Sequence, residues 1–144
     1  MAQALTPVLA GVDFEPVVYE ERAEFADKAL FRGASKVICA EFADVLGNAE
    51  LSGGDYVAIM TRGHSDDLTV LKQILSTGVE YIGLMGSRSK RAILFEKLKN
   101  DGFTDRDLAR IHNPIGLDIG SETPEEIAVS ITAEMIAVRA GRKE

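Results

Sequence analysis

The sequence contains no tryptophan, one cysteine and two histidines among 144 residues. The single cysteine, Cys39, excludes an internal disulfide and fits a reducing compartment, so we expect a cytoplasmic protein. His64 and His112 do not stand in a cysteine–histidine cluster with zinc-ligand spacing, so we expect no metal site. No apolar run approaches the roughly 20 residues that span a bilayer. Residues 1–5 lack the basic stretch of a signal peptide, so we expect neither secretion nor membrane association.

Positive charge is also in short supply. Lys and Arg number 16 against 23 Asp and Glu, which gives a net charge of −7. Because an acidic surface repels phosphate backbones, we expect no nucleic-acid partner. The 46% of apolar residues is ordinary for a soluble protein, and the length suffices for one domain with a core. We therefore predict a single domain over residues 1–144.

The glycine-rich phosphate motifs are missing as well, since neither G-x-G-x-x-G nor a P-loop occurs. Short apolar runs nevertheless alternate with amphipathic stretches, which is typical of βαβ units and a parallel sheet buried on both faces. The runs that predict strands are residues 15–20, 36–40, 55–60 and 81–85. A helix predicted over residues 1–9 has no strand before it, whereas a Rossmann unit begins with a central strand and a glycine-rich turn.

These patterns predict an α/β protein with a Rossmann-like, three-layer αβα fold and a mainly parallel sheet that lacks the usual first strand. A lost central strand would leave its neighbours with unpaired backbone groups. We therefore expect either that the flanking strands pair directly or that the protein forms a homodimer.

Three further helices carry end signals. The first helix has Ser65 as its predicted N-cap and ends at Gly78. The second begins at Gly86-Ser87 and ends before Gly102. The third has the best signals, a capping box and an early proline, formed by Thr123, Pro124 and Glu126. The residues predicted to face the core are Leu68, Leu71, Ile74 and Leu75 in the first helix, Ala92, Phe95 and Leu98 in the second, and Ile127, Ile131, Met135 and Val138 in the third.

Two predicted strand ends on the second half of the sheet offer candidate chemistry, because ligands of open parallel sheets bind beyond the carboxyl ends of the strands. Gly86-Ser87-Arg88 precedes a helix, and a glycine turn at a helix N-terminus favours an anion such as phosphate. The alternative is an ordinary turn with solvated basic residues. His64 could shuttle a proton or contact a ligand, or it could be a loop histidine. Asp67 could orient the His64 ring or be a plain first-turn acid.

Two further segments carry acids. Glu20 and Glu21 end a strand where dinucleotide-binding folds place a ribose-binding acid; the alternative is a solvated ion pair with Arg22. The segment 116–120 places Asp118 between Gly116 and Gly120, which indicates a tight loop that presents a carboxylate. Cys39 is interpreted as a small core residue at a strand end.

Several of these segments resemble one family. Residues 116–131, GLDIGSETPEEIAVSI, resemble the G-L-D-I-G-A-x-T-P-E-E-I-A-V-S-I motif of the C-terminal domain of XdhC/CoxI proteins, and the Ala133-Glu134 pair follows. Residues 81–88 are similar to its Y-I-G-L-x-G-S-R/K segment. Residues 61–71 and 20–25 resemble its T-H/R-x-H-x-x-D-L-x-x-L and acid-x-R-x-x-[FY] patterns. The resemblance extends over essentially the whole chain.

This resemblance implies a Rossmann-like domain of a xanthine dehydrogenase accessory factor. Such a chaperone would bind molybdenum cofactor (molybdopterin), support its sulfuration and deliver it to an apo molybdenum hydroxylase, with a cysteine desulfurase as a further partner. It would act by binding and transfer more than by turnover, and the resemblance assigns no catalytic residue. The residues expected to bind the cofactor are Glu20, Arg22, His64, Asp67, Gly86, Ser87, Arg88, Gly116, Asp118 and Gly120. The family's first strand and G-x-G-H-V-A turn would precede residue 1, so we expect the chain to be truncated at its N-terminus relative to the family.

Two alternatives remain open. The first is an NAD(P)-dependent, oxidoreductase-like nucleotide-binding domain, against which the missing glycine motif argues. The second is a non-enzymatic interaction module whose pocket is vestigial.

Overall fold

The computed structural model describes residues 1–141, which form two compact units. The terminal unit consists of Met1–Asn48 together with the chain from Gly116 onward, and the central unit consists of Ala49–Ile115. Each unit contains its own parallel sheet and its own helices. The prediction of a single domain over the whole chain stays a prediction.

Every strand pair is parallel. In the terminal unit β1 (Val17–Glu20) pairs with β2 (Lys36–Cys39). In the central unit β4 (Tyr81–Leu84) lies between β3 (Tyr56–Ile59) and β5 (Ile111–His112). The expected Rossmann-like α/β fold with parallel strands is thus confirmed, and all four predicted strands form. The sequence analysis missed β5, because two residues are too short for a periodic signal.

The unpaired edges of the two sheets concern the expected pairing around the absent central strand. Among the described residues β1 pairs only with β2, and β3 pairs only with β4. The five strands form two sheets, one in each unit, and direct pairing of the strands that would flank the expected central strand stays a prediction. The homodimer, which was the other expected closure, stays a prediction.

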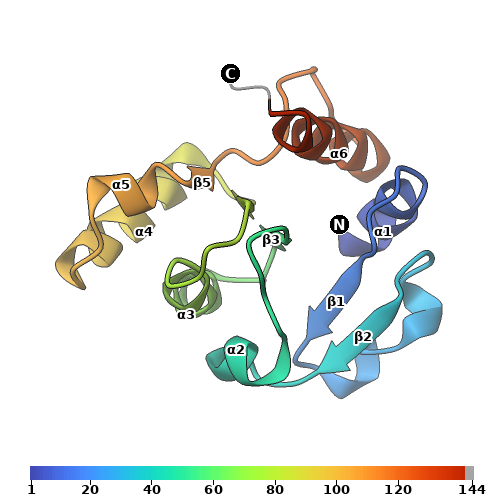
Figure 1. Cartoon of the computed structure of the whole chain (residues 1–144), viewed down its shortest axis with the longest axis horizontal. Coiled ribbons are helices and arrows are strands. Elements are labelled where there is room, and N and C mark those ends of the chain that lie inside the picture. The colour runs from blue at the N-terminus through green and yellow to red at the C-terminus, as the bar shows by residue number, and fades with distance from the viewer. Residues whose placement is uncertain (142–144) are drawn as a thin grey trace. The chain divides into compact units, whose positions relative to one another are not determined.

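In the terminal unit, α1 (Ala2–Ala10) packs against α6 (Pro124–Arg139), as Figure 1 shows. The capping box of α6 is confirmed: the Thr123 hydroxyl accepts from the amide of Glu126, whose carboxylate accepts from the Thr123 amide. Arg139 joins the end of α6 to the segment after α1, donating to the Val12 carbonyl at 2.9 Å and lying over the Phe14 ring. Of the predicted core stripe of α6, Ile131 and Met135 are buried and Ile127 and Val138 only partly so.

Short helical turns complete the terminal unit. They are η1 (Ala23–Phe25), η2 (Lys28–Leu30), η3 (Phe42–Asp44) and α2 (Val45–Asn48). The Tyr19 hydroxyl links β1 to this region through the carbonyls of Glu41 and Asp44, at 3.2 and 3.1 Å. The expectation that these strands are buried on both faces was wrong, since β1 and β2 are partly exposed. For the same reason Cys39 is exposed at the end of β2, and its interpretation as a core residue was wrong.

The central unit has the better-buried sheet. All four residues of β4 are buried, as expected for a strand flanked on both sides. The aromatic rings of Tyr56, Tyr81 and His112 stack across the three strands, with centroids 5.8 and 4.7 Å apart. The helices of this unit are α3 (His64–Ile74), α4 (Arg88–Asn100) and α5 (Asp105–Leu108). No helix in residues 1–141 is long and apolar enough to cross a bilayer.

Three details of the predicted helices need correction. Gly63, not Ser65, is the N-cap of α3, since the Asp67 amide already donates to the Gly63 carbonyl. The same helix ends at Ile74, before Gly78, because the Ser76 and Thr77 hydroxyls and the Arg110 guanidinium satisfy its last carbonyls. In α4 the buried residues are Leu94 and Leu98; Ala92 is exposed and Phe95 half-buried, so the predicted stripe was out of phase.

Candidate functional site

Two of the predicted ligand-binding segments lie at one edge of the central sheet. Because β3 and β4 are parallel neighbours, their carboxyl ends share an edge. β3 leads into residues 61–67 and β4 into residues 86–88. We call these two segments together the central rim. Open parallel sheets bind ligands at such edges.

Asp67 is the buried acid of the central rim. Its side chain accepts a hydrogen bond of 2.5 Å from the Thr61 hydroxyl, and the Thr61 amide also donates to it. Burial raises the pKa of Asp67 above its ordinary value, and the two Thr61 bonds oppose this shift only in part. Asp67 therefore fixes the loop that follows β3. Its hydrogen-bond partner is Thr61, and the structure shows no bond by which it would orient the His64 ring.

His64 is the first residue of α3. Its Nδ1 atom is buried and has no hydrogen-bond partner among the described residues. Buried polar atoms of proteins are seldom left unsatisfied, and an unsatisfied one calls for a partner such as water or a ligand. This orphaned nitrogen is the strongest local sign that the central rim accepts a molecule.

The β4–α4 turn provides the anion-binding features. Gly86 has φ +150°, a conformation that side chains other than glycine rarely adopt. Ser87 is the N-cap of α4 and accepts from the Lys90 amide. The next residue, Arg88, is exposed at the start of the helix, where free amides and the helix dipole favour an anion.

The sequence analysis missed a residue that holds this turn in place. The Asn113 side-chain amide donates to the carbonyls of Leu84 and Gly86, at 2.8 and 3.2 Å. Arg91 in turn donates to the Asn113 carbonyl at 2.9 Å. The available signal was the Asn113-Pro114 dipeptide, which is typical of turns.

A surface hollow of about 390 Å³ lies beside the β4–α4 turn. Its lining residues are Arg88, Arg91, Ala92, Phe95, Asn113 and Pro114. Two guanidinium groups therefore border the hollow, beside aromatic and aliphatic surface. Such a lining suits a ligand that has both an anionic group and an apolar part.

In the terminal unit, Glu20 and Arg22 bind each other. The Arg22 guanidinium donates to both oxygens of the Glu20 carboxylate, at 3.0 and 3.2 Å, and the Arg22 amide donates to one of them at 3.0 Å. The side-chain hydrogen bond from Arg22 lowers the pKa of Glu20 below its ordinary value. Arg22 also lies over the Phe25 ring, 4.2 Å from its centroid. This geometry matches the ion pair that the sequence left as the alternative to a ribose site.

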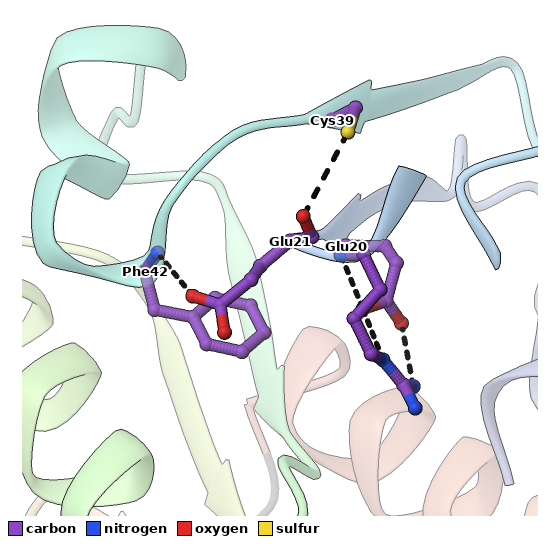
Figure 2. A network of polar contacts seen from close by, with 5 residues as sticks. Glu20, Glu21, Cys39 and Phe42 are labelled. Atoms are coloured by element: carbon purple, nitrogen blue, oxygen red, sulfur yellow. Dashed lines mark hydrogen bonds and ion pairs between the residues drawn. The ribbon is translucent and has the colours of Figure 1, made fainter. Parts of the chain in front are cut away.

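The neighbouring residue Glu21 also forms hydrogen bonds within the terminal unit, as Figure 2 shows. The Glu21 carboxylate accepts from the Phe42 amide at 3.3 Å, and the Cys39 thiol donates to the Glu21 carbonyl at 3.9 Å. We call residues 20–22 with Cys39 and Phe42 the terminal rim. Most of its polar groups bond one another, but the buried Arg22 Nη1 atom has no hydrogen-bond partner among the described residues.

The loop 116–120 is attached to α6. Gly116 has φ +93°, and its amide donates to the Glu134 carboxylate at 3.1 Å. Leu117 exchanges two bonds with Ser130: its amide donates to the Ser130 carbonyl, and its carbonyl accepts from the Ser130 hydroxyl. Asp118 follows and is exposed, and its carboxylate has no hydrogen bond or ion pair with the residues that the structure describes. Gly120, with φ +73°, ends the loop.

The structure thus places the ten predicted residues in three groups. His64, Asp67, Gly86, Ser87 and Arg88 lie in the central rim, while Glu20 with Arg22, and Gly116 with Asp118 and Gly120, belong to the terminal unit. That all ten converge on one ligand stays a prediction. Within residues 1–141, no group of three or more His, Cys, Asp or Glu side chains is arranged to hold a metal ion.

Comparison with known proteins identifies the family. A family model described as the XdhC Rossmann domain matches residues 1–135. The chain belongs to this family. The match covers both units, including the central rim and the loop 116–120.

Relatives of the XdhC Rossmann domain support this assignment. The chain is 33% identical over 137 residues to a Bacillus subtilis (strain 168) protein named as a probable xanthine dehydrogenase subunit, covering 94% of this chain and 39% of the relative. It is 28% identical over 138 residues to the uncharacterized protein YqeB of Escherichia coli (strain K12), covering 95% and 25%.

A solved structure agrees in fold. The crystal structure of a protein from Bacillus halodurans, described as a xanthine dehydrogenase, superposes with a TM-score of 0.85 at 31% identity, covering 99% of this chain and 40% of that one. The chain therefore spans less than half the length of each of these three relatives.

Proposed function

We propose that this protein is an accessory factor for molybdenum hydroxylases of the xanthine dehydrogenase type. In this role it binds molybdenum cofactor for sulfuration and for insertion into the apo-enzyme. The observation that carries the proposal is membership of the XdhC Rossmann domain family over residues 1–135. The name of the B. subtilis relative, a probable xanthine dehydrogenase subunit, links the family to such hydroxylases.

The residues of the central rim fit such a ligand. The phosphate of the cofactor suits Ser87, Arg88 and the free amides at the start of α4, and Gly86 lets the backbone approach it. The unsatisfied Nδ1 atom of His64 offers a further polar contact. When bound, the cofactor would supply the molybdenum centre of the client hydroxylase, while the residues of this chain bind and orient it.

The partners follow from the same role. An apo molybdenum hydroxylase would receive the cofactor, a cysteine desulfurase would provide its sulfur, and a second copy of the chain would complete a homodimer. The NAD(P)-binding alternative is less favoured, because Arg22 already occupies the Glu20 carboxylate that would bind a ribose.

The test is a titration of the purified protein with molybdenum cofactor and, separately, with NADH. We expect cofactor binding that Arg88→Ala weakens about tenfold or more, the usual effect of removing a charged hydrogen bond. Arg106→Ala, which removes an exposed arginine of α5 outside the central rim, is the matched control and leaves the affinity unchanged.

A second measurement tests delivery. Apo-hydroxylase mixed with the loaded wild-type protein should gain molybdenum and activity faster than with free cofactor. Binding of NADH in preference to molybdenum cofactor would instead support the oxidoreductase-like alternative. Capture of the hydroxylase without binding of either small molecule would support the interaction module.

A further inference from the structure

The helix α4 differs in charge from the rest of this acidic chain. In the whole sequence 23 acidic residues stand against 16 basic ones, whereas α4 is mostly basic. Its charged residues are five cations, Arg88, Lys90, Arg91, Lys97 and Lys99, and one acid, Glu96. All six are exposed. The helix α4 therefore presents a basic surface, which attracts an acidic partner.

A groove of about 610 Å³ lies between α4 and the segment that forms α5 and β5. We call it the α4 groove. Its apolar lining residues are Ala92, Phe95, Leu108, Ala109 and Ile111. Arg91 and Lys99 also line it, and the Arg91 guanidinium lies over the Phe95 ring, 5.3 Å from its centroid. Apolar surface bordered by charged side chains is typical of a surface that binds a protein segment.

Two acids also line the α4 groove, and they differ in their partners. The Asp105 carboxylate is paired with the Lys99 ammonium group at 2.7 Å, so these two charges offset each other. The Glu96 carboxylate has no hydrogen bond or ion pair with the residues that the structure describes. Glu96 is therefore expected to repel an acidic partner, and its removal provides a test of the sign of the interaction.

The α4 groove adjoins the hollow beside the β4–α4 turn. Arg91, Ala92 and Phe95 line both, and Arg88 of the central rim lines the hollow. A protein that hands a bound ligand to another protein has to present its binding site at their interface, because the ligand otherwise crosses open solvent. The α4 groove has this position beside the ligand site that we propose.

We propose that the α4 groove docks the enzyme that receives the cofactor, through an acidic segment of that enzyme that also carries apolar side chains. The cations of α4 attract the acidic groups, and the surface around Ala92 and Phe95 takes the apolar ones. The inference rests on the proposed function and adds the surface by which this chain meets its client.

Opposite substitutions in the groove test the sign of the charge effect. The association of the full chain with an apo molybdenum hydroxylase is followed by stopped-flow fluorescence at low salt. We expect Lys99→Glu to slow association about threefold or more and Glu96→Lys to accelerate it, because interface charges act mainly on the association rate. Both effects should shrink in about 0.5 M salt, which screens exposed charges. Lys28→Glu, at an exposed position of η2, is the charge-matched control and should have little effect.

The shape of the groove is tested by filling it. Ala92→Arg introduces a good helix former and a further positive charge, but its long side chain would occupy the apolar surface of the groove. We expect the affinity for the hydroxylase to fall about tenfold or more, although the added charge alone would raise it. Ala109→Arg repeats the test from the other side of the groove, and thermal unfolding identifies the variants that are folded.

The proposal would be overturned if the wild-type chain formed no complex with the hydroxylase. It would equally be overturned if Lys99→Glu and Glu96→Lys changed the association rate in the same direction, or if the folded arginine variants bound as tightly as the wild type. Self-association of the wild-type chain that Ala92→Arg abolishes, with unchanged binding of the hydroxylase, would assign the groove to a second copy of the chain instead.

The outcome can be separated from that of the proposed function. A hydroxylase complex that responds to these variants, formed by a chain that binds no molybdenum cofactor, would keep the docking surface and reject cofactor delivery. Delivery of the cofactor at the wild-type rate by Lys99→Glu and Ala92→Arg would do the reverse.

Discussion

The terminal rim and the central rim occupy corresponding places, at the carboxyl ends of parallel strands, but they treat their polar groups differently. In the terminal rim Glu20 binds Arg22, Glu21 binds the Phe42 amide, and the Cys39 thiol bonds the Glu21 carbonyl. In the central rim the Nδ1 atom of His64 has no partner among the described residues, and Arg88 stands exposed at a helix start. Most polar groups of the terminal rim thus bond one another, although the Arg22 Nη1 atom has no partner among the described residues, whereas the central rim leaves the His64 Nδ1 atom and the exposed Arg88 to the ligand that we propose.

The pKa of one carboxyl group in each rim is shifted from its ordinary value, and the two shifts have opposite directions. Arg22 lowers the pKa of Glu20, whereas burial raises the pKa of Asp67. Glu20 is the last residue of β1, and Asp67 lies in the first turn of α3. The difference arises from the neighbours. The Arg22 guanidinium favours the charged form of Glu20, whereas the hydrogen bonds from Thr61 offset the effect of burial on Asp67 only in part.

The largest effect is expected from Gly116→Ala, which tests how firmly the terminal unit is held together by internal contacts. A Cβ atom at this position would meet the Ser130 hydroxyl, and lie 3.1 Å from the Ile131 amide nitrogen, in a backbone with φ +93°. Overpacking and the left-handed backbone together should lower the free energy of unfolding by about 2–4 kcal/mol. Urea denaturation measures this loss.

Gly120→Ala is the matched control for this variant. Gly120 also has a positive φ, +73°, but a Cβ atom there would meet nothing within 4 Å. Only the backbone cost of about 1 kcal/mol should remain. Equal losses in the two variants would mean that the loop is not packed against α6 as described.

The sequence predicted well those features that depend on local chemistry. The strands formed at the four apolar runs, and the Thr123 cap of α6 formed because hydroxyl, proline and acid stand at fixed offsets. The segments of the candidate site were also found locally, because glycines and strand ends mark them. The family match over residues 1–135 agrees with the resemblance inferred from residues 116–131.

What the sequence did not predict depends on partners far apart along the chain. Arg110 satisfies the end of α3 through Leu75 and Thr77, more than 30 residues away, so Gly78 was taken as the terminator. Asn113 reaches back to Gly86 across 27 residues. Glu134 bonds Gly116 from the third turn of α6, which only the fold reveals. The exposure of Cys39 likewise follows from the small size of the sheet around it.

A smaller effect is expected from Asp67→Asn, which sharpens the comparison of the two carboxyl groups. Because the folded-state pKa of Asp67 is raised, folding favours its protonated form. The contribution of Asp67 to stability is therefore greatest below its unfolded pKa and declines as the pH rises through the folded pKa. In the variant the side-chain amide oxygen at position 67 can still accept from the Thr61 hydroxyl, but the side chain does not ionise, so stability does not decline for this reason as the pH rises. Thermal unfolding from pH 3 to pH 7 should show a flatter profile for the variant, and parallel profiles would contradict the burial of the carboxylate.

The smallest effect is expected from Arg22→Ala, and its sign is opposite. Because Arg22 holds the pKa of Glu20 below its ordinary value, the pair contributes stability that is present above the unfolded pKa of Glu20 and is lost as the pH falls through the folded pKa. The contribution is modest, because the Arg22 side chain is 32% exposed and solvent screens the pair. In Arg22→Ala the pKa of Glu20, followed through its side-chain carboxyl resonance, should rise toward the ordinary value. Lys28→Ala, an exposed cation outside the pair, provides the reference and should leave it unchanged. If Glu20 titrates identically with and without Arg22, the guanidinium does not engage the Glu20 carboxylate in solution, and this acid is available to a ligand after all.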